Sequence, residues 1–179
     1  MAGRNLVVIS ACLLGENTRF DGTIKSSPIV CEIAKYCKVI KICPEVAIGF
    51  PVPRPRVFLY DAQGEFKVIQ EGTKKDLTKE IENFCINFLT QLPPVDAFIL
   101  KSKSPSCSPS PTTKFYKDLE GKELIGRTYG IMGRLIPEFF PQIPVIDELS
   151  LKGETGLKFL KKLFGSSIPN SILQLLQEQ

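Results

Sequence analysis

Three cysteines of this sequence share a position just beyond a short apolar run of the kind that forms a buried strand. The runs and their cysteines are 5–10 with Cys12, 38–42 with Cys43, and 96–102 with Cys107. Because the carboxyl ends of parallel strands share one edge of a sheet, and ligand sites open at that edge, we expect the three thiols to converge there. Convergent thiols favour a metal, cluster or thiol-based site over a packing role.

The other three cysteines have positions that are typical of packing residues. Cys85 lies on the apolar stripe of a predicted helix, and Cys31 falls within another helix. Cys37 lies at a helix-to-strand turn, toward the opposite edge of the predicted sheet. Free cysteine is commonly buried as a small hydrophobic residue, so we expect these three to pack rather than to react.

The absence of histidine narrows the chemistry further. The 179 residues contain no histidine. This excludes Ser-His-Asp and Cys-His nucleophile pairs, histidine metal ligands and any imidazole acid or base. Chemistry in this protein must therefore use cysteine, carboxylate, hydroxyl, lysine, arginine or a cofactor.

Three thiolates are compatible with more than one kind of site. Structural zinc normally takes four protein ligands, but catalytic zinc takes three and keeps a water. A 4Fe–4S cluster held by three cysteines leaves one iron open, which is a catalytic arrangement. A third hypothesis is a thiol redox protein that uses Cys12 or Cys107, although the sequence has no C-x-x-C pair. Spacing alone does not choose among these, nor does it exclude a zinc protein that binds RNA or a partner without catalysis.

The elements that must position these cysteines alternate along the chain. Besides the three apolar runs, residues 143–147 read as a fourth strand, and helical periodicity predicts helices at 26–36, 76–91, 127–136 and, as a pair, within 153–179. A hairpin is expected at 57–60 and 65–69, and a polar loop at 104–123. Strands that alternate with helices predict an α/β fold: a Rossmann-like, three-layer parallel sheet with helices on both faces.

Size and composition fit a single compact domain. The chain has 179 residues, 43% of them hydrophobic, and a net charge of +4. The apolar run at residues 6–11 is shorter than the roughly 7–15 residues of a signal peptide core, and no segment approaches the ~20 apolar residues of a membrane span. We therefore expect a cytoplasmic protein without a membrane partner, whose cysteines are reduced thiols or metal ligands rather than disulfides.

Five segments resemble a known family. "VVISACLLGENTRFDG", "CPEVAIGFPVPRPR" and "LKSKSPSC" resemble the three signature blocks of the DUF523 family, the thiouracil desulfidases. "YGIMGRLI" and "IPVIDE" resemble its closing blocks, so the likeness covers about residues 5–148. The resemblance implies a catalytic domain over residues 1–150. Residues 151–179 would then be a helical extension packed on the same domain.

The resemblance also implies an activity and a cofactor. In the family, three cysteines bind a 4Fe–4S cluster whose open iron takes the sulfur of a thiolated pyrimidine. The base leaves as uracil and the sulfur as sulfide, without redox change. Carried over by position, Cys12, Cys43 and Cys107 match the cluster ligands, Glu45 the catalytic acid or base, and Ser104 its partner. The expected substrate is a thiolated pyrimidine or nucleoside, with tRNA as an alternative, and the expected state is a monomer or homodimer.

The chemistry of these residue types agrees with such roles. An open iron is both a Lewis acid and a soft acceptor for sulfur. Glu45 lies two residues from a ligand, close enough to activate water or to protonate the ring. Each residue also has a plainer interpretation, since Glu45 is equally typical of a helix start and Ser104 of a turn.

Four charged residues lie on loops at the same predicted edge. They are Arg19, Asp21, Arg54 and Arg56. Arginine suits planar and phosphate groups, so this set is a candidate for binding a uracil edge or a ribose phosphate. Alternatively, Arg54 and Arg56 brace the proline-rich loop in which they lie.

Overall fold

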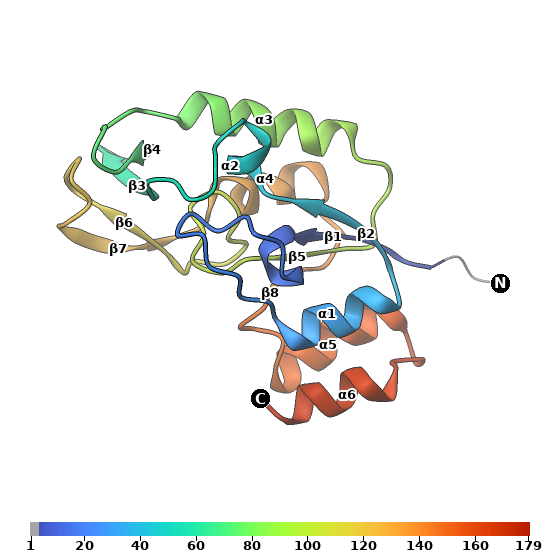
Figure 1. Ribbon diagram of the computed structural model, residues 1–179. Helices are drawn as coiled ribbons and strands as arrows, with labels where there is room; N and C mark the ends of the chain where they lie inside the picture. Colours follow the sequence, from blue (N-terminus) through green and yellow to red (C-terminus); the bar gives the residue numbers. More distant parts are fainter. Residues whose placement is uncertain (1–3) are drawn as a thin grey trace.

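The central sheet is parallel and has four strands. A computed structural model describes residues 4–179 of the chain (Figure 1). The strand order is β2-β1-β5-β8, where β1 is Leu6–Ser10, β2 is Lys38–Ile42, β5 is Ala97–Leu100 and β8 is Val145–Asp147. Val8 pairs with Ile40 on one side and Phe98 on the other, both in parallel register. The four predicted strands and their parallel arrangement are confirmed.

Helices cover both faces of this sheet. On one face lie α1 (Pro28–Lys35), α5 (Gly153–Phe164) and α6 (Asn170–Gln177), which Figure 1 shows together. On the other lie α3 (Thr78–Gln91) and α4 (Ile131–Phe139). Side chains of a strand alternate between faces, so Val7 and Ile9 enter the core beneath α1, whereas Val8 enters the core beneath α3. The predicted three-layer α/β architecture is confirmed.

The C-terminal helices belong to the first of these cores. Phe159 and Leu160 of α5 and Ile172 of α6 are buried with Ile33 of α1. The division of the chain at residue 150 stays a prediction, although residues beyond it contribute to a core that begins at β1. Within residues 4–179, no helix combines the length and the apolar character needed to cross a membrane.

A second four-stranded sheet lies beside the first. Its order is β4-β3-β6-β7, where β3 is Val57–Ala62, β4 is Glu65–Gln70, β6 is Thr113–Tyr116 and β7 is Leu124–Thr128. The antiparallel β3–β4 pair is the predicted hairpin.

Strands β6 and β7 correct two sequence-based expectations. Residues 104–123 were expected to be a polar loop without strands, and a helix was expected to begin at residue 127. Instead, Thr113 pairs with Thr128 in an antiparallel ladder, and the helix begins at Ile131. Strand β6 also pairs with β3, which lies more than 50 residues earlier in the chain. Local periodicity does not detect such non-local pairing.

Candidate active site

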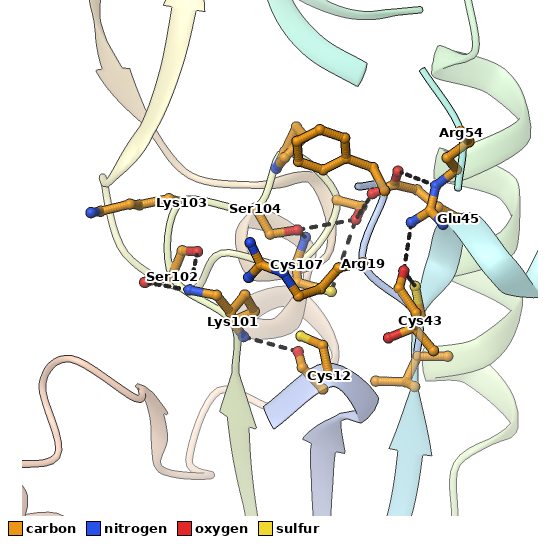
Figure 2. A pocket seen from close by; sticks show the side chains of 16 residues that line it. Cys12, Arg19, Cys43, Glu45, Arg54, Lys101, Ser102, Lys103, Ser104 and Cys107 are labelled. Atoms are coloured by element: carbon orange, nitrogen blue, oxygen red, sulfur yellow. Dashed lines mark hydrogen bonds and ion pairs between the residues drawn. The ribbon is translucent and has the colours of Figure 1, made fainter. Parts of the chain in front are cut away.

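The three strand-end cysteines line one cavity. The cavity has a volume of about 260 Å³, and Cys12, Cys43 and Cys107 are among the sixteen residues around it. Figure 2 shows the three side chains, from three separate loops, around a common space. The loops follow β1, β2 and β5, whose carboxyl ends share this edge of the sheet. The structure thus brings together the cysteines that the sequence singled out.

Short turns immediately after the strands position Cys12 and Cys43. Cys12 lies in a 3-10 turn, Ala11–Leu14, which ends at Gly15 with a left-handed φ of 85°. Cys43 is the extended residue before α2 (Pro44–Ala47), and Pro44 begins that helix. Each cysteine is therefore fixed by a short helical turn at the end of its own strand.

The loop that carries Cys107 is held by the start of α4. The first N–H groups of a helix have no partner within it, and here they donate to carbonyl oxygens of the loop. Gly130, Ile131 and Met132 donate to Ser108, Pro105 and Ser106 respectively, each at 2.9 Å. The loop thus caps the helix, and the helix in turn fixes the loop.

Two glycines allow this close approach. A Cβ atom on Gly133 would lie 1.9 Å from the carbonyl oxygen of Ser108, and one on Gly130 would lie 2.4 Å from the backbone nitrogen of Ser108. No side chain fits at either position without moving the loop. The glycines of "YGIMGRLI" are therefore explained by the contact between α4 and the Cys107 loop.

The cysteine thiols are buried, and burial raises their pKa. The pKa of Cys12 rises from 9.0 to about 11, mainly by desolvation, with Lys101 acting in the opposite direction. Desolvation also raises the pKa of Cys43, and that of fully buried Cys107 well above its usual value. A reactive redox cysteine needs a lowered pKa, so these thiols do not resemble redox nucleophiles. Each must release its proton to become a metal ligand.

Glu45 lies in the same cavity, in a buried ion pair. Its Oε1 accepts a hydrogen bond from Arg54 Nε at 3.1 Å, and the two side chains are 10% and 3% exposed. Arg54 also donates to the carbonyl oxygens of Thr18, at 2.8 Å, and Pro51, at 3.2 Å. Arg54 therefore ties its own loop to the loop of Thr18 at the cavity wall and orients Glu45 within the cavity.

A pair of serines connects Glu45 to the Cys107 loop. Ser106 Oγ donates to Glu45 Oε2 at 3.0 Å and lies 3.2 Å from Ser104 Oγ. Ser104 Oγ accepts a hydrogen bond from the Cys107 N–H at 3.1 Å. The two residues proposed from sequence, Glu45 and Ser104, are thus joined through Ser106. Sequence reasoning missed Ser106, although it is the second serine of "SPSC".

A second network, also missed from sequence, closes the side of the cavity beside Cys12. The Lys101 ammonium forms an ion pair with Glu148 and donates to the carbonyl oxygen of Ser102 at 3.2 Å. The Ser102 N–H donates to Glu148 Oε2 at 2.8 Å. These bonds tie the end of β5 to the end of β8. The only sequence signal was the position of "LKSKS" and "IDE" directly after two strands.

The other candidate binding residues are divided between two places. Arg19 lines the cavity and is held by Thr23 Oγ1, at 2.8 Å, and by Asp21. Asp21 is not part of the cavity lining, and hydrogen bonds from Thr23 lower its pKa to about 2. Arg56 lies in an adjoining groove, where it pairs with Glu71. The structure therefore brings Arg19 and Arg54 to the cysteines and leaves Asp21 and Arg56 outside.

The three thiols are spread around the cavity rather than gathered at one point. Within the described part of the chain, no three cysteine, aspartate, glutamate or histidine side chains lie close enough together to hold one metal ion. In a 4Fe–4S cluster each thiolate binds a different iron, so the sulfurs need not meet at one point. The donor set and its spread thus fit a cluster better than a single zinc ion.

Comparisons with known proteins point in the same direction. Residues 7–148 match the family model described as 2-thiouracil desulfurase. The uncharacterized protein YbbK of Bacillus subtilis (strain 168) is 27% identical over 111 aligned positions, and the alignment covers 57% of this chain and 72% of YbbK. The solved structure of TudS, a 4Fe–4S-dependent thiouracil desulfidase, is 28% identical with a TM-score of 0.64, and the match covers 87% of this chain and 97% of TudS. With most of its length matched by that family model, this chain belongs to the 2-thiouracil desulfurase family.

Proposed function

We propose that this protein is an iron–sulfur-dependent desulfidase that replaces the sulfur of thiolated uracil by oxygen. The products are uracil, or uridine from a nucleoside, and hydrogen sulfide. The observation that carries this proposal is the cavity in which three strand-end cysteines meet Glu45 and a serine pair. Membership of the 2-thiouracil desulfurase family and the likeness to TudS support it.

Cys12, Cys43 and Cys107 would hold a 4Fe–4S cluster in this site. They are the three cysteines of the cavity lining, so a cubane bound by them keeps one iron for an outside ligand. Three thiolates give such a cluster a net negative charge. The ammonium of Lys101 and the guanidinium of Arg19, both in the lining, supply positive charge beside Cys12. The charges of the cavity therefore complement the cluster.

The overall reaction needs water and proton transfer but no electrons. Water adds its oxygen at the carbon that carries sulfur, and both of its protons leave with the sulfur as hydrogen sulfide. When bound, the cluster supplies a soft Lewis acid for the sulfur. The protein supplies the group that moves the protons. Glu45 is that group in our proposal, because Arg54 and Ser106 hold its two oxygens in fixed directions at the cavity wall.

Ser104 would orient the substrate or the attacking water. Its Oγ accepts from the Cys107 N–H, which leaves its own hydroxyl proton for Ser106 or for a ligand. The chain of Ser104, Ser106 and Glu45 therefore gives the site a continuous hydrogen-bonded edge. Such an edge fixes a polar ring more firmly than separate groups do.

A second candidate is the same reaction on a phosphate-bearing substrate, either a nucleotide or 4-thiouridine in tRNA. The groove beside the cavity shares Phe20, Glu45, Lys103 and Pro105 with it and has a volume of about 450 Å³. Four cationic side chains line the groove: Arg56, Lys103, Lys114 and Arg127. This row of cations next to the base site suits the phosphate of a nucleotide, whereas the net charge of +4 on the whole chain attracts a polyanion such as tRNA only weakly.

Anaerobic reconstitution tests the proposal. The wild-type protein should become brown and bind about four irons with about four sulfides. It should then release sulfide from 2-thiouracil or 4-thiouracil. Replacement of Cys12, Cys43 or Cys107 by alanine should abolish both properties. Cys37→Ala is the matched control, because Cys37 is buried near the opposite end of β2. A colourless protein that binds one zinc would refute the proposal in favour of a zinc site.

The same assay separates the two candidate substrates. We expect small thiolated pyrimidines and nucleosides to be better substrates than tRNA, because a net charge of +4 on 179 residues attracts a polyanion only weakly. The opposite result would be turnover of tRNA alone. That turnover should then fall steeply between about 50 and 200 mM salt, the range over which phosphate-dependent binding weakens.

A further inference from the structure

Phe20 has an unusual position among the apolar side chains of this protein. It is a large hydrophobic residue that stays 41% exposed, and it lines both the cysteine cavity and the adjoining cationic groove. Of the described residues around the cysteine cavity, it is the one with an aromatic ring. The remaining walls are mainly thiols, hydroxyls and charged groups. Phe20 therefore supplies the flat apolar surface of the site.

A rigid turn holds Phe20 in this position. The carbonyl oxygen of Arg19 accepts the N–H of Gly22 at 3.1 Å, which closes a turn with Phe20 at its second residue. The carbonyl oxygen of Phe20 accepts the N–H of Arg54 at 2.8 Å. Arg54 also orients Glu45 through its guanidinium, so the turn and the carboxylate are fixed to the same residue, the first by its backbone and the second by its side chain.

The chemistry of the substrate matches such a surface. A thiolated pyrimidine is planar and aromatic, and aromatic side chains stack on nucleobases with little preference among them. A hydrogen-bonding edge formed by Ser104 and Glu45 fixes the ring in its plane but does not cover its face. The ring face needs an apolar partner that is already in place, because a fixed partner loses less entropy on binding.

We propose that the pyrimidine ring of the substrate stacks on Phe20, which makes Phe20 a substrate-affinity residue at the junction of the cavity and the groove. This inference rests on the proposed function. It goes further by naming the residue that recognises the aromatic ring itself, independently of the sulfur. It also places the ring where a substituent on its nitrogen can extend into the cationic groove.

Binding of uracil and of 5,6-dihydrouracil to the cluster-loaded protein tests the inference. The saturated ring of dihydrouracil keeps the hydrogen-bonding groups but loses planarity and aromaticity. Phe20→Leu keeps an apolar side chain of similar size without the ring, and Phe20→Tyr keeps the ring. In calorimetry, Phe20→Leu should weaken uracil binding about 5-fold to 150-fold, the range that stacking on one base spans. It should weaken dihydrouracil binding by about twofold or less, since that ring stacks poorly.

The controls separate stacking from damage to the loop. Phe20→Tyr should bind uracil about as tightly as the wild type. Ile24→Ala should do the same, because Ile24 lies in the same loop, is 64% exposed and lines neither the cavity nor the groove. In turnover assays Phe20→Leu should raise KM with kcat within about twofold, the pattern of a residue that binds substrate and transition state equally.

The outcomes distinguish this inference from the proposed function. If Phe20→Leu binds uracil as tightly as the wild type, or if both pyrimidines lose affinity equally, the stacking role is wrong even when the enzyme is active. A wild-type protein that does not bind uracil also overturns it. If uracil binds in a Phe20-dependent manner but no thiolated base releases sulfide, the inference stands and the proposed reaction fails.

Discussion

At the scale of single residues, the buried ion pair with Arg54 fixes the position of the Glu45 carboxylate in the cavity and compensates its charge. Both side chains are nearly buried, and the guanidinium also holds two loop carbonyls. Breaking a buried ion pair by removing one partner is costly, because the other charge is left without compensation. Glu45 thus has a structural role beside its proposed chemical one, and an experiment must separate the two.

Glu45→Gln is the substitution that separates them. Glutamine keeps the size and an acceptor for Arg54 or Ser106, but it has no titratable proton. We expect normal iron and sulfide content and a loss of roughly 10²–10⁴-fold in kcat, the usual scale for a general acid or base. The free energy of unfolding should also fall, since Arg54 loses its counter-charge.

Measuring cluster content and turnover on the same preparation decides the interpretation. Cys43→Ala, two residues away, should lose the cluster and all activity together. A Glu45→Gln protein with a full cluster and a near-normal rate would leave Glu45 with the structural role alone. Proton transfer would then have to come from water or from another group of the cavity.

At the scale of elements, the contact between α4 and the Cys107 loop determines where Cys107 lies. The helix donates its first N–H groups to three loop carbonyls, and two glycines let the backbones approach. Such a contact fixes Cys107 and Ser106 together, because both lie within the four residues that the helix holds. The closing block "YGIMGRLI" therefore acts at the site without lining the cavity.

Gly133→Ala tests this contact. The added Cβ would meet the backbone of Ser108 at 1.9 Å, so the loop or the helix must shift. We expect the free energy of unfolding to fall by about 1–3 kcal/mol, the typical cost of overpacking. Cluster content after reconstitution should fall as well, because Cys107 moves with the loop. Urea unfolding and iron analysis provide the two readouts.

The neighbouring residue Arg134 is the matched control for this prediction. Its side chain is 41% exposed and forms a surface ion pair with Glu82 at 3.4 Å. Arg134→Ala should change the free energy of unfolding by less than about 1 kcal/mol and leave cluster content unchanged. If Gly133→Ala and Arg134→Ala lower stability and cluster content equally, the cause is a general sensitivity of α4 to substitution. The contact with the Cys107 loop would then not be responsible.

At the scale of the whole molecule, the burial of the cysteine thiols makes the stability of the metal-free fold depend on pH. Burial holds the pKa of Cys12 at about 11, against 9.0 in an exposed thiol. Below pH 9 this thiol is protonated in both the folded and the unfolded chain. Above pH 9 the unfolded chain releases the proton first, so the stability associated with the raised pKa is lost as pH rises toward 11.

The metal-free protein should therefore become less stable at high pH. Between pH 8 and pH 10, Cys12 alone should account for a loss of about 1 kcal/mol in the free energy of unfolding. The measurement is urea unfolding of the metal-free wild type and of Cys12→Ala at both pH values. The wild type should lose more stability than the variant by that amount. Equal losses would mean that the Cys12 thiol is not desolvated in the metal-free fold.

The sequence alone was enough to predict that three cysteines converge at one edge of the sheet and to predict the layers of the fold. Cys12, Cys43 and Cys107 each follow an apolar run, and the convergence of parallel strand ends is a topological rule that needs no contacts. The inner strands β1 and β5 were predicted because a strand buried on both faces is apolar along nearly its whole length. Family membership was predicted because the blocks around these cysteines are contiguous segments.

Only the tertiary structure decided how the site is held together. The partners of Glu45 lie 9 and 61 residues away in Arg54 and Ser106, and Lys101 meets Glu148 across 47 residues. Strand β6 likewise pairs with β3, more than 50 residues earlier in the chain, and β7 extends the sheet by pairing with β6. A residue's own type and periodicity determine its local conformation and burial, but such long-range partners are fixed only when the loops pack against one another. The sequence therefore indicates which side chains could do chemistry, and packing determines which of them meet.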